Sequence, residues 1–106
     1  MRRYEMMLLL RPDLNTEKKQ EILKKFEESI SKNGGRLETL NRWSENRPLA
    51  YTIRSRGAYK HKFDHADYIL CYFWMPQEGL DKFKFDLNLI EEILRYLIIK
   101  RDKKNV

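Results

Sequence analysis

The sequence has 106 residues, of which 42% are hydrophobic and 36% charged, and its 22 basic and 16 acidic side chains give a formal net charge of +6. That length allows one domain with a single modest core, and the positive balance favours an acidic partner. One cysteine, Cys71, excludes an internal disulfide and indicates a reducing compartment. The sequence has no apolar run of 18 residues and Met6–Leu10 is too short for a signal peptide, so we expect no membrane span and no membrane partner.

The first half of the chain predicts a strand, a helix and a second strand. Tyr4–Leu10 is a short apolar run stopped by Arg11-Pro12-Asp13, which favours a buried strand. Asn15 or Thr16 then suits the cap of a helix that ends at Gly34-Gly35. The apolar residues of this helix fall on one face and are Ile22, Leu23, Phe26 and Ile30. A strand follows over Arg36–Leu40.

The second half repeats the strand, helix and strand order. After a break at Ser44–Pro48 the second strand resumes over Leu49–Ile53, and a basic, exposed connection covers Arg54–Ala66. Tyr68–Met75 is an aromatic and apolar third strand, ended by Pro76. A second amphipathic helix carries apolar residues at spacings of three and four, namely Leu80, Phe83, Leu87, Ile90 and Leu94. A last strand over Tyr96–Ile99 precedes a basic tail.

The element order β-α-β-β-α-β predicts an α+β fold of the ferredoxin-like type. Its most economical form is a four-stranded antiparallel sheet with both helices on one face. We expect one domain over residues 1–100 and a short basic tail over 101–106. The fold hosts many functions, so function has to be argued from the surface.

Both faces of the predicted sheet carry apolar side chains, although only one face is covered by helices. Strand alternation leaves large apolar groups on the open face, whichever way the strands point. The residues proposed for a protein-partner face are Met7, Leu9, Tyr72 and Trp74. A contiguous apolar surface of this kind usually marks a partner site, whereas the simpler alternative is a solvated sheet that is rich in apolar residues.

Basic residues gather in one fifth of the chain, where six cations stand against one acid, Glu45. The cations are Arg42, Arg47, Arg54, Arg56, Lys60 and Lys62, with Trp43, Tyr51 and Tyr59 among them. Six minus one gives +5 of the formal +6. Point charges, planar guanidinium groups and aromatic faces together are typical of nucleic-acid contacts. The alternative is a solvated charged surface.

Other residue patterns do not predict chemistry. His61 and His65, beside Asp64 and Asp67, would converge on a metal only in a helix, and this segment reads as an exposed loop, so no metal is expected. Cys71 lies mid-strand and reads as a buried, inert thiol. The sequence shows no Gly-rich phosphate loop, nucleophile elbow or paired carboxylates, so we expect no enzyme, no cofactor and no small-molecule substrate.

An ordered set of short motifs resembles a known family. The set consists of Arg2-Arg3-Tyr4-Glu5, Arg11-Pro12-Asp13-Leu14, Gly34-Gly35-Arg36, Leu49-Ala50-Tyr51-Thr52-Ile53, Met75-Pro76 and Ile93-Leu94-Arg95-Tyr96-Leu97-Ile98-Ile99-Lys100. Together these motifs resemble bacterial small-subunit ribosomal protein number six, over about residues 2 to 100. Departures from the family pattern are Pro48, Thr52 and a long connection over Gly57–Ala66.

The resemblance implies a structural role in the small ribosomal subunit, in the bacterial cytoplasm or the plastid stroma. It implies binding to the central domain of small-subunit rRNA together with small-subunit protein number eighteen. Our own hypothesis is that the sheet surface and the first-strand edge hold this small basic partner. The basic positions that it implies are Arg2, Arg3, Arg47 and Lys100, while Arg42, Arg54, Arg56, Lys60 and Lys62 follow from charge and position.

Two other readings stay open at this point. One is a ferredoxin-like interaction module that dimerises through its open sheet face and binds no RNA. The other is a single-strand binder of the RNA-recognition type, with Tyr72 or Trp74 stacked on bases. Arg56-Gly57-Ala58-Tyr59 begins like the signature of that type, but Tyr68–Met75 has no Gly or Lys at its head.

Overall fold

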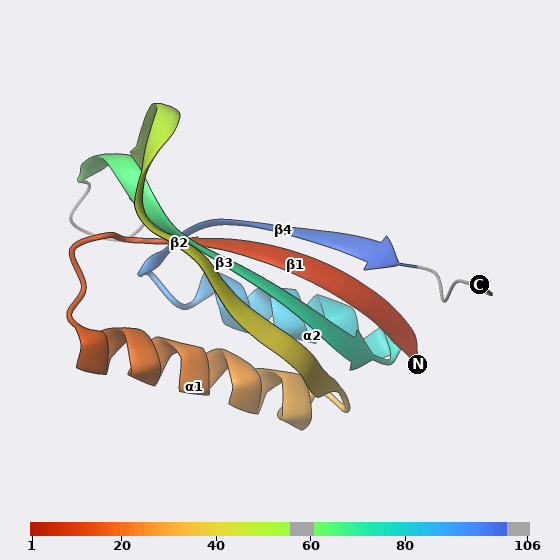
Figure 1. Ribbon diagram of the computed structural model, residues 1–106. Coiled ribbons are helices and arrows are strands. Elements are labelled where there is room, and N and C mark those ends of the chain that lie inside the picture. Colours follow the sequence, from red (N-terminus) through yellow and green to blue (C-terminus); the bar gives the residue numbers. More distant parts are fainter. Residues whose placement is uncertain (56–60, 102–106) are drawn as a thin grey trace.

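The computed structural model describes residues 1–55 and 61–101, apart from the side chains of Arg42 and Trp43. Its elements are β1 (Arg2–Leu10), α1 (Thr16–Lys32), β2 (Arg36–Arg54), β3 (Lys62–Met75), α2 (Gln77–Asn88) and β4 (Ile93–Arg101). The strands form one four-stranded antiparallel sheet in the order β2-β3-β1-β4, with both helices on one face (Figure 1). The predicted ferredoxin-like fold is confirmed.

The prediction that β1 offers an edge to a partner is wrong. Each strand–helix–strand unit of this fold leaves a gap between its two strands, and a strand of the other unit fills it. As a result β1 lies between β3 and β4, and β2 and β4 are the edges of the sheet. A partner can reach β1 only from the open face.

The sheet and helices enclose the main core through alternate residues of the two central strands. The buried inward residues are Tyr4, Met6, Leu8 and Leu10 of β1 and Ile69, Cys71, Phe73 and Met75 of β3. The Phe73 ring lies 5.4 Å from that of Tyr4 and 5.2 Å from that of Phe83 on α2. Cys71 is fully buried, as predicted, and desolvation raises the pKa of its thiol to about 12.

Helix α1 begins and ends as its sequence predicts. Asn15 is the cap, and its Oδ1 accepts a hydrogen bond of 2.7 Å from the backbone N–H of Lys18. The helix ends before Gly34, whose φ of +85° suits glycine. Gly35 then passes so close to β3 that a Cβ would lie 2.3 Å from the carbonyl oxygen of Trp74. Neither helix within the described residues is long and apolar enough to cross a membrane.

Helix α2 ends at Asn88, so the prediction that it extends to Leu94 is wrong. The N–H of Ile93 donates to the carbonyl of Ile90 in a tight turn, and the chain enters β4 there. The apolar spacing of three and four continues past the helix end because Leu94 serves a second, smaller core. Periodicity alone therefore could not distinguish the end of the helix from the next strand.

The hairpin of β2 and β3 is longer than predicted. Strand β2 runs through the expected break at Ser44–Pro48, with register shifts instead of an interruption, and β3 begins at Lys62. His65 therefore lies in a strand, and the expected loop over Gly57–Ala66 was assigned too long. Residues 56–60 lie outside the described residues.

The far end of this hairpin, here called the arm, comprises Arg47–Arg54 of β2 and Lys62–Ala66 of β3. In Figure 1 it rises from the sheet on the side away from the helices. Ile53 and Ala66 of the arm are buried against Leu94 of β4 and form a second, smaller core. The partly buried residues that pack against this core are Leu9, Leu49, Phe63 and Tyr68. Because Leu9 and Tyr68 belong to the open face, the arm covers one end of that face.

Candidate nucleic-acid and protein interface

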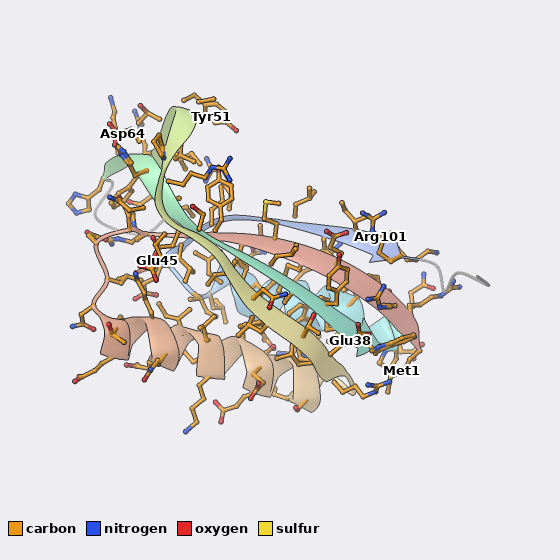
Figure 2. All side chains as sticks on the ribbon, viewed as in Figure 1. Met1, Glu38, Glu45, Tyr51, Asp64 and Arg101 are labelled. Carbon is orange, nitrogen blue, oxygen red and sulfur yellow. The ribbon has the colours of Figure 1, made fainter. Side chains whose placement is uncertain are left out.

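Strand β2 makes an outward excursion in the arm. Pro48 pairs with His65 and Ile53 pairs with Phe63, so the four residues 49–52 stand opposite Asp64 alone. Tyr51 lies in this excursion and is 72% exposed. Figure 2 shows it at the far end of the arm.

Three of the predicted RNA-binding cations lie on the arm. Arg47 pairs with Ala66, Arg54 pairs with Lys62, and the side chains of Arg47, Arg54 and Lys62 are all exposed. The guanidinium of Arg47 lies 5.3 Å from the centre of the Tyr68 ring. Arg42 lies in β2 opposite Ile69, with its side chain outside the description, and the predictions on Arg56 and Lys60 also fall outside the described residues.

A buried carboxylate fixes the base of the arm. Asp67 is 4% exposed, and its Oδ1 accepts a hydrogen bond of 2.7 Å from the backbone N–H of Asn46. Its Oδ2 lies 2.6 Å from Nζ of Lys19 on α1. Asn46 has a φ of +48°, a left-handed conformation that Asn tolerates better than most residues. The register of β2 shifts here, immediately before Arg47, so Asp67 holds the bend that positions Arg47.

Hydrogen bonds also close the distal end of the arm. The N–H of Ser55 donates to the carbonyl of His61, and the N–H of His61 donates to Oγ of Ser55 at 2.9 Å. His65 Nδ1 lies 2.8 Å from Oδ1 of Asp64, and this hydrogen bond lowers the pKa of the Asp64 carboxyl. In the described part of the chain, no three His, Cys, Asp or Glu side chains are grouped to hold a metal ion.

A second polar cluster lies at the opposite end of the open face. Arg3 donates two hydrogen bonds to Glu38, of 3.0 and 2.8 Å, and Trp74 Nε1 donates to the same carboxylate at 2.7 Å. The hydrogen bond from Arg3, and to a smaller extent that from Trp74, lowers the pKa of Glu38 to about 2. Arg3 lies 4.5 Å over the Tyr72 ring, and Arg36 lies 5.4 Å over the Trp74 ring.

Two predicted site residues, Arg3 and Trp74, are already engaged in this cluster. Arg3 is paired with the Glu38 carboxylate, and Trp74 is fixed by its hydrogen bond to Glu38 and by the Arg36 guanidinium over its ring. Glu38 was not predicted from the sequence, because its partners Arg3 and Trp74 are 35 and 36 residues away in the chain. Alternation on β2 could have placed Glu38 on the same face as Trp74, but no local motif marks the pairing.

The remaining predicted cations lie near this same end. Arg2 and Lys100 are exposed and pair in the sheet with Met75 and Tyr4, which face the core, so the two cations lie on the helix side of the sheet. Along β3, the partners of Arg3 and Arg47 are eight residues apart, which corresponds to about 27 Å at the usual strand rise. The predicted RNA-binding side chains that the structure describes therefore form two separate groups.

Between the two ends the open face is apolar. Leu70 of β3, Met7 of β1 and Leu97 of β4 lie in one row across the sheet, and Tyr72, Glu5 and Ile99 lie in the next row. Leu97 is 58% and Ile99 39% exposed. Glu5 is held by Arg101, whose Nη2 lies 2.6 Å from Glu5 Oε1.

The structure brings the predicted partner residues together only in part. Met7 and Tyr72 are half-buried in the centre of the face, whereas Leu9 packs against the second core and Trp74 belongs to the polar cluster. Leu97 and Ile99 are the additions that the structure makes. Their alternation with Tyr96 and Ile98, which face the helices, is the sequence signal that could have found them.

The fold and these surfaces define a ferredoxin-like domain whose candidate contacts lie on an exposed arm and an open sheet face. Compared with known proteins, the chain matches the Ribosomal protein S6 family over residues 3–100. The chain therefore belongs to the ribosomal protein S6 family, whose members are small-subunit ribosomal proteins with a structural role in translation.

Individual relatives align with nearly the whole length of this chain. It is 32% identical over 104 residues to a small ribosomal subunit protein bS6 of Dictyoglomus turgidum, covering 98% of this chain and 99% of that protein. It is 31% identical to the bS6 protein of Campylobacter jejuni, covering 98% and 77% of the two chains. A crystal structure of 30S ribosomal protein S6 from Thermotoga maritima has a TM-score of 0.80 at 24% identity, covering 94% and 87%, and supports the fold.

Proposed function

We propose that this protein binds the central domain of small-subunit rRNA jointly with small-subunit ribosomal protein number eighteen. The observation that carries the proposal is the arrangement of the two surfaces. An exposed basic arm rises on the same side of the sheet as an open apolar face (Figure 1), and both lie away from the helices. One ligand with phosphates and one with apolar side chains can therefore be held next to each other.

The protein partner is assigned to the centre of the open face, around Met7, Tyr72, Leu97 and Ile99. Leu97 and Ile99 are exposed apolar side chains on an edge strand, and burying such groups is the main driving force in protein association. Glu5, in the row of Tyr72 and Ile99, and Glu38, beside Trp74, already pair with arginines. The partner therefore gains affinity here from apolar contacts.

The RNA is assigned first to the arm, through Arg47, Arg54 and Lys62. Exposed guanidinium and ammonium groups bind phosphates and 2′-hydroxyls, which positions a protein on RNA without reading much sequence. Arg2 and Lys100 are assigned to a second contact at the other end of the sheet, on its helix side. Arg3 contributes less than predicted because Glu38 pairs with it, and the roles of Arg42, Arg56 and Lys60 stay predictions.

The relatives compared above are bacterial, which favours a ribosome in the bacterial cytoplasm over one in the plastid stroma. The RNA-recognition alternative is less favoured, because Trp74 is held by Glu38 and Arg36 in place of a base. The dimerisation module without RNA draws on the same exposed Leu97 and Ile99. It predicts a homodimer in the absence of other components, which sedimentation of the purified protein would detect.

The test uses the reconstituted complex of this protein, the partner protein and a central-domain rRNA fragment. Replacing Arg47 and Arg54 together by Ala should weaken RNA binding and reduce the slope of log affinity against log salt by about 1.4 to 1.8. The matched control replaces Lys24 and Lys32 of α1, two exposed cations on the helix side. Equal affinity and slope in both double variants would refute a role of the arm in RNA binding.

A further inference from the structure

The excursion of β2 presents an aromatic ring in an unusual way. In a regular strand, residues 49, 51 and 53 share one face. Here Leu49 and Ile53 pack into the second core, while Tyr51 between them is 72% exposed. The four residues opposite Asp64 turn the ring outward, and the half-buried Leu49 and the buried Ile53 anchor the turn on either side.

The charges around this ring are those of a phosphate-binding surface. In the arm, Arg47–Arg54 and Lys62–Ala66, the cations are Arg47, Arg54 and Lys62, and the one acid is Asp64. Three minus one gives a net charge of +2. The Asp64 carboxylate is hydrogen-bonded to the His65 ring. Arg47 and Arg54 flank the excursion at its two ends, and their β3 partners are four residues apart, about 14 Å along a strand.

We propose that Tyr51 is a stacking platform for an unpaired nucleobase, with Arg47 and Arg54 binding the phosphates on either side of that nucleotide. An exposed aromatic ring among cations is the usual arrangement for binding single-stranded nucleic acid. A paired base has both faces covered by its neighbours in the helix, so the ligand is a nucleotide in an internal loop, a bulge or a single-stranded segment. The inference rests on the proposed function and adds to it the ligand that Tyr51 binds.

Stacking and phosphate binding differ in their dependence on salt. Each phosphate contact contributes to the salt slope, whereas stacking on a neutral ring contributes affinity without releasing counterions. Tyr51→Ala should therefore weaken binding about 5- to 150-fold and leave the salt slope unchanged. Tyr51→Phe keeps the ring and should bind as the native protein does, while Tyr51→Leu keeps an apolar side chain and should be as weak as the Ala variant.

The experiment measures the affinity of the reconstituted complex for two RNAs. One is the central-domain fragment, and the other is the same fragment with its internal loops closed by complementary substitutions. The loss caused by Tyr51→Ala is expected on the first RNA only. Phe85→Ala is the matched control, because Phe85 is a 56% exposed aromatic residue on α2, and it should change neither affinity.

Several outcomes would overturn the inference. If Tyr51→Ala lost equal affinity for both RNAs, or if Tyr51→Leu bound RNA as tightly as the native protein, the ring would not stack on an unpaired base. If Tyr51→Ala lost affinity for the partner protein while direct RNA binding stayed unchanged, Tyr51 would be a protein contact. If Tyr51→Ala binds like the native protein while the Arg47 and Arg54 variant is weakened, the platform is refuted and the proposed function stands. If the native complex binds neither RNA, both are refuted.

Discussion

Removing the ion pair between Lys19 and Asp67 should destabilise the protein more than any other change of a single polar side chain discussed above. Asp67 is 4% exposed, and its Oδ2 makes no well-aligned hydrogen bond to the described residues. The ammonium of Lys19 at 2.6 Å is therefore what compensates the charge of that oxygen. Among the described residues, Lys19→Met would leave the buried carboxylate with the N–H of Asn46 as its one partner.

The magnitude follows from the burial of the two side chains. Removing one partner of a buried pair costs about 3 to 5 kcal/mol. The Lys19 side chain is 14% exposed, so water reaches the pair and we expect a cost of about 3 kcal/mol. Asp67→Asn keeps an acceptor for Asn46 and leaves the ammonium close to solvent, so it should cost about 2 kcal/mol. The double variant should cost less than the sum, because neither charge is then left unpaired.

Urea unfolding of the three variants measures these free energies directly. The midpoint should fall without a change in the m-value if the variants lose stability alone. In a domain of this size, a loss of 2 kcal/mol corresponds to a lower Tm of about 8 °C. If both single variants cost less than about 0.5 kcal/mol, typical of a surface pair, the buried carboxylate does not hold the arm.

Two further predictions concern the ends and the centre of the open face. Because the folded-state pKa of Glu38 is about 2, below its ordinary value of 4.5, its pairing contributes stability above about pH 4.5, and that stability is lost as the pH falls towards 2. Between pH 5 and pH 3 the urea midpoint of Glu38→Gln should therefore fall less than that of the native protein, and parallel curves would contradict this. Leu97→Glu should abolish the complex with the partner protein in native mass spectrometry and leave the Tm nearly unchanged, since Leu97 is 58% exposed; a complex that persists would move the partner off the centre of the face.

The sequence predicts the sheet and the first helix because their signals are local. Tyr4–Leu10 and Tyr68–Met75 are short, almost wholly apolar runs that end at Pro-containing turns, and Asn15 and Gly34 bound α1 by side-chain capping and a positive φ. These features need no knowledge of distant residues. For the same reason the element order alone yields the ferredoxin-like arrangement, once both helices need a face to cover.

The arm could not be predicted because its shape depends on contacts between distant residues. Pro48 and the residues around it read as a break, yet β2 continues through them because β3 pairs alongside and Asp67 holds Asn46 from 21 residues away. Ile53 is buried by Leu94, which the sequence pattern assigned to a helix. The exposure of Tyr51 follows from this packing and not from any local preference of its neighbours.

The same long-range pairing explains why counting cations overestimates the RNA-binding surface. Arg3 and Arg101 are as basic in sequence as Arg54, but Glu38 and Glu5 bind them across the sheet. Their charges are balanced within the domain, and phosphate would have to compete with a carboxylate at 2.8 Å or less. Exposed Arg54 and Lys62 pair with each other in register and so concentrate positive charge at the arm. Two cations opposite each other repel, which weakens this end of the hairpin, and a bound phosphate would relieve that repulsion.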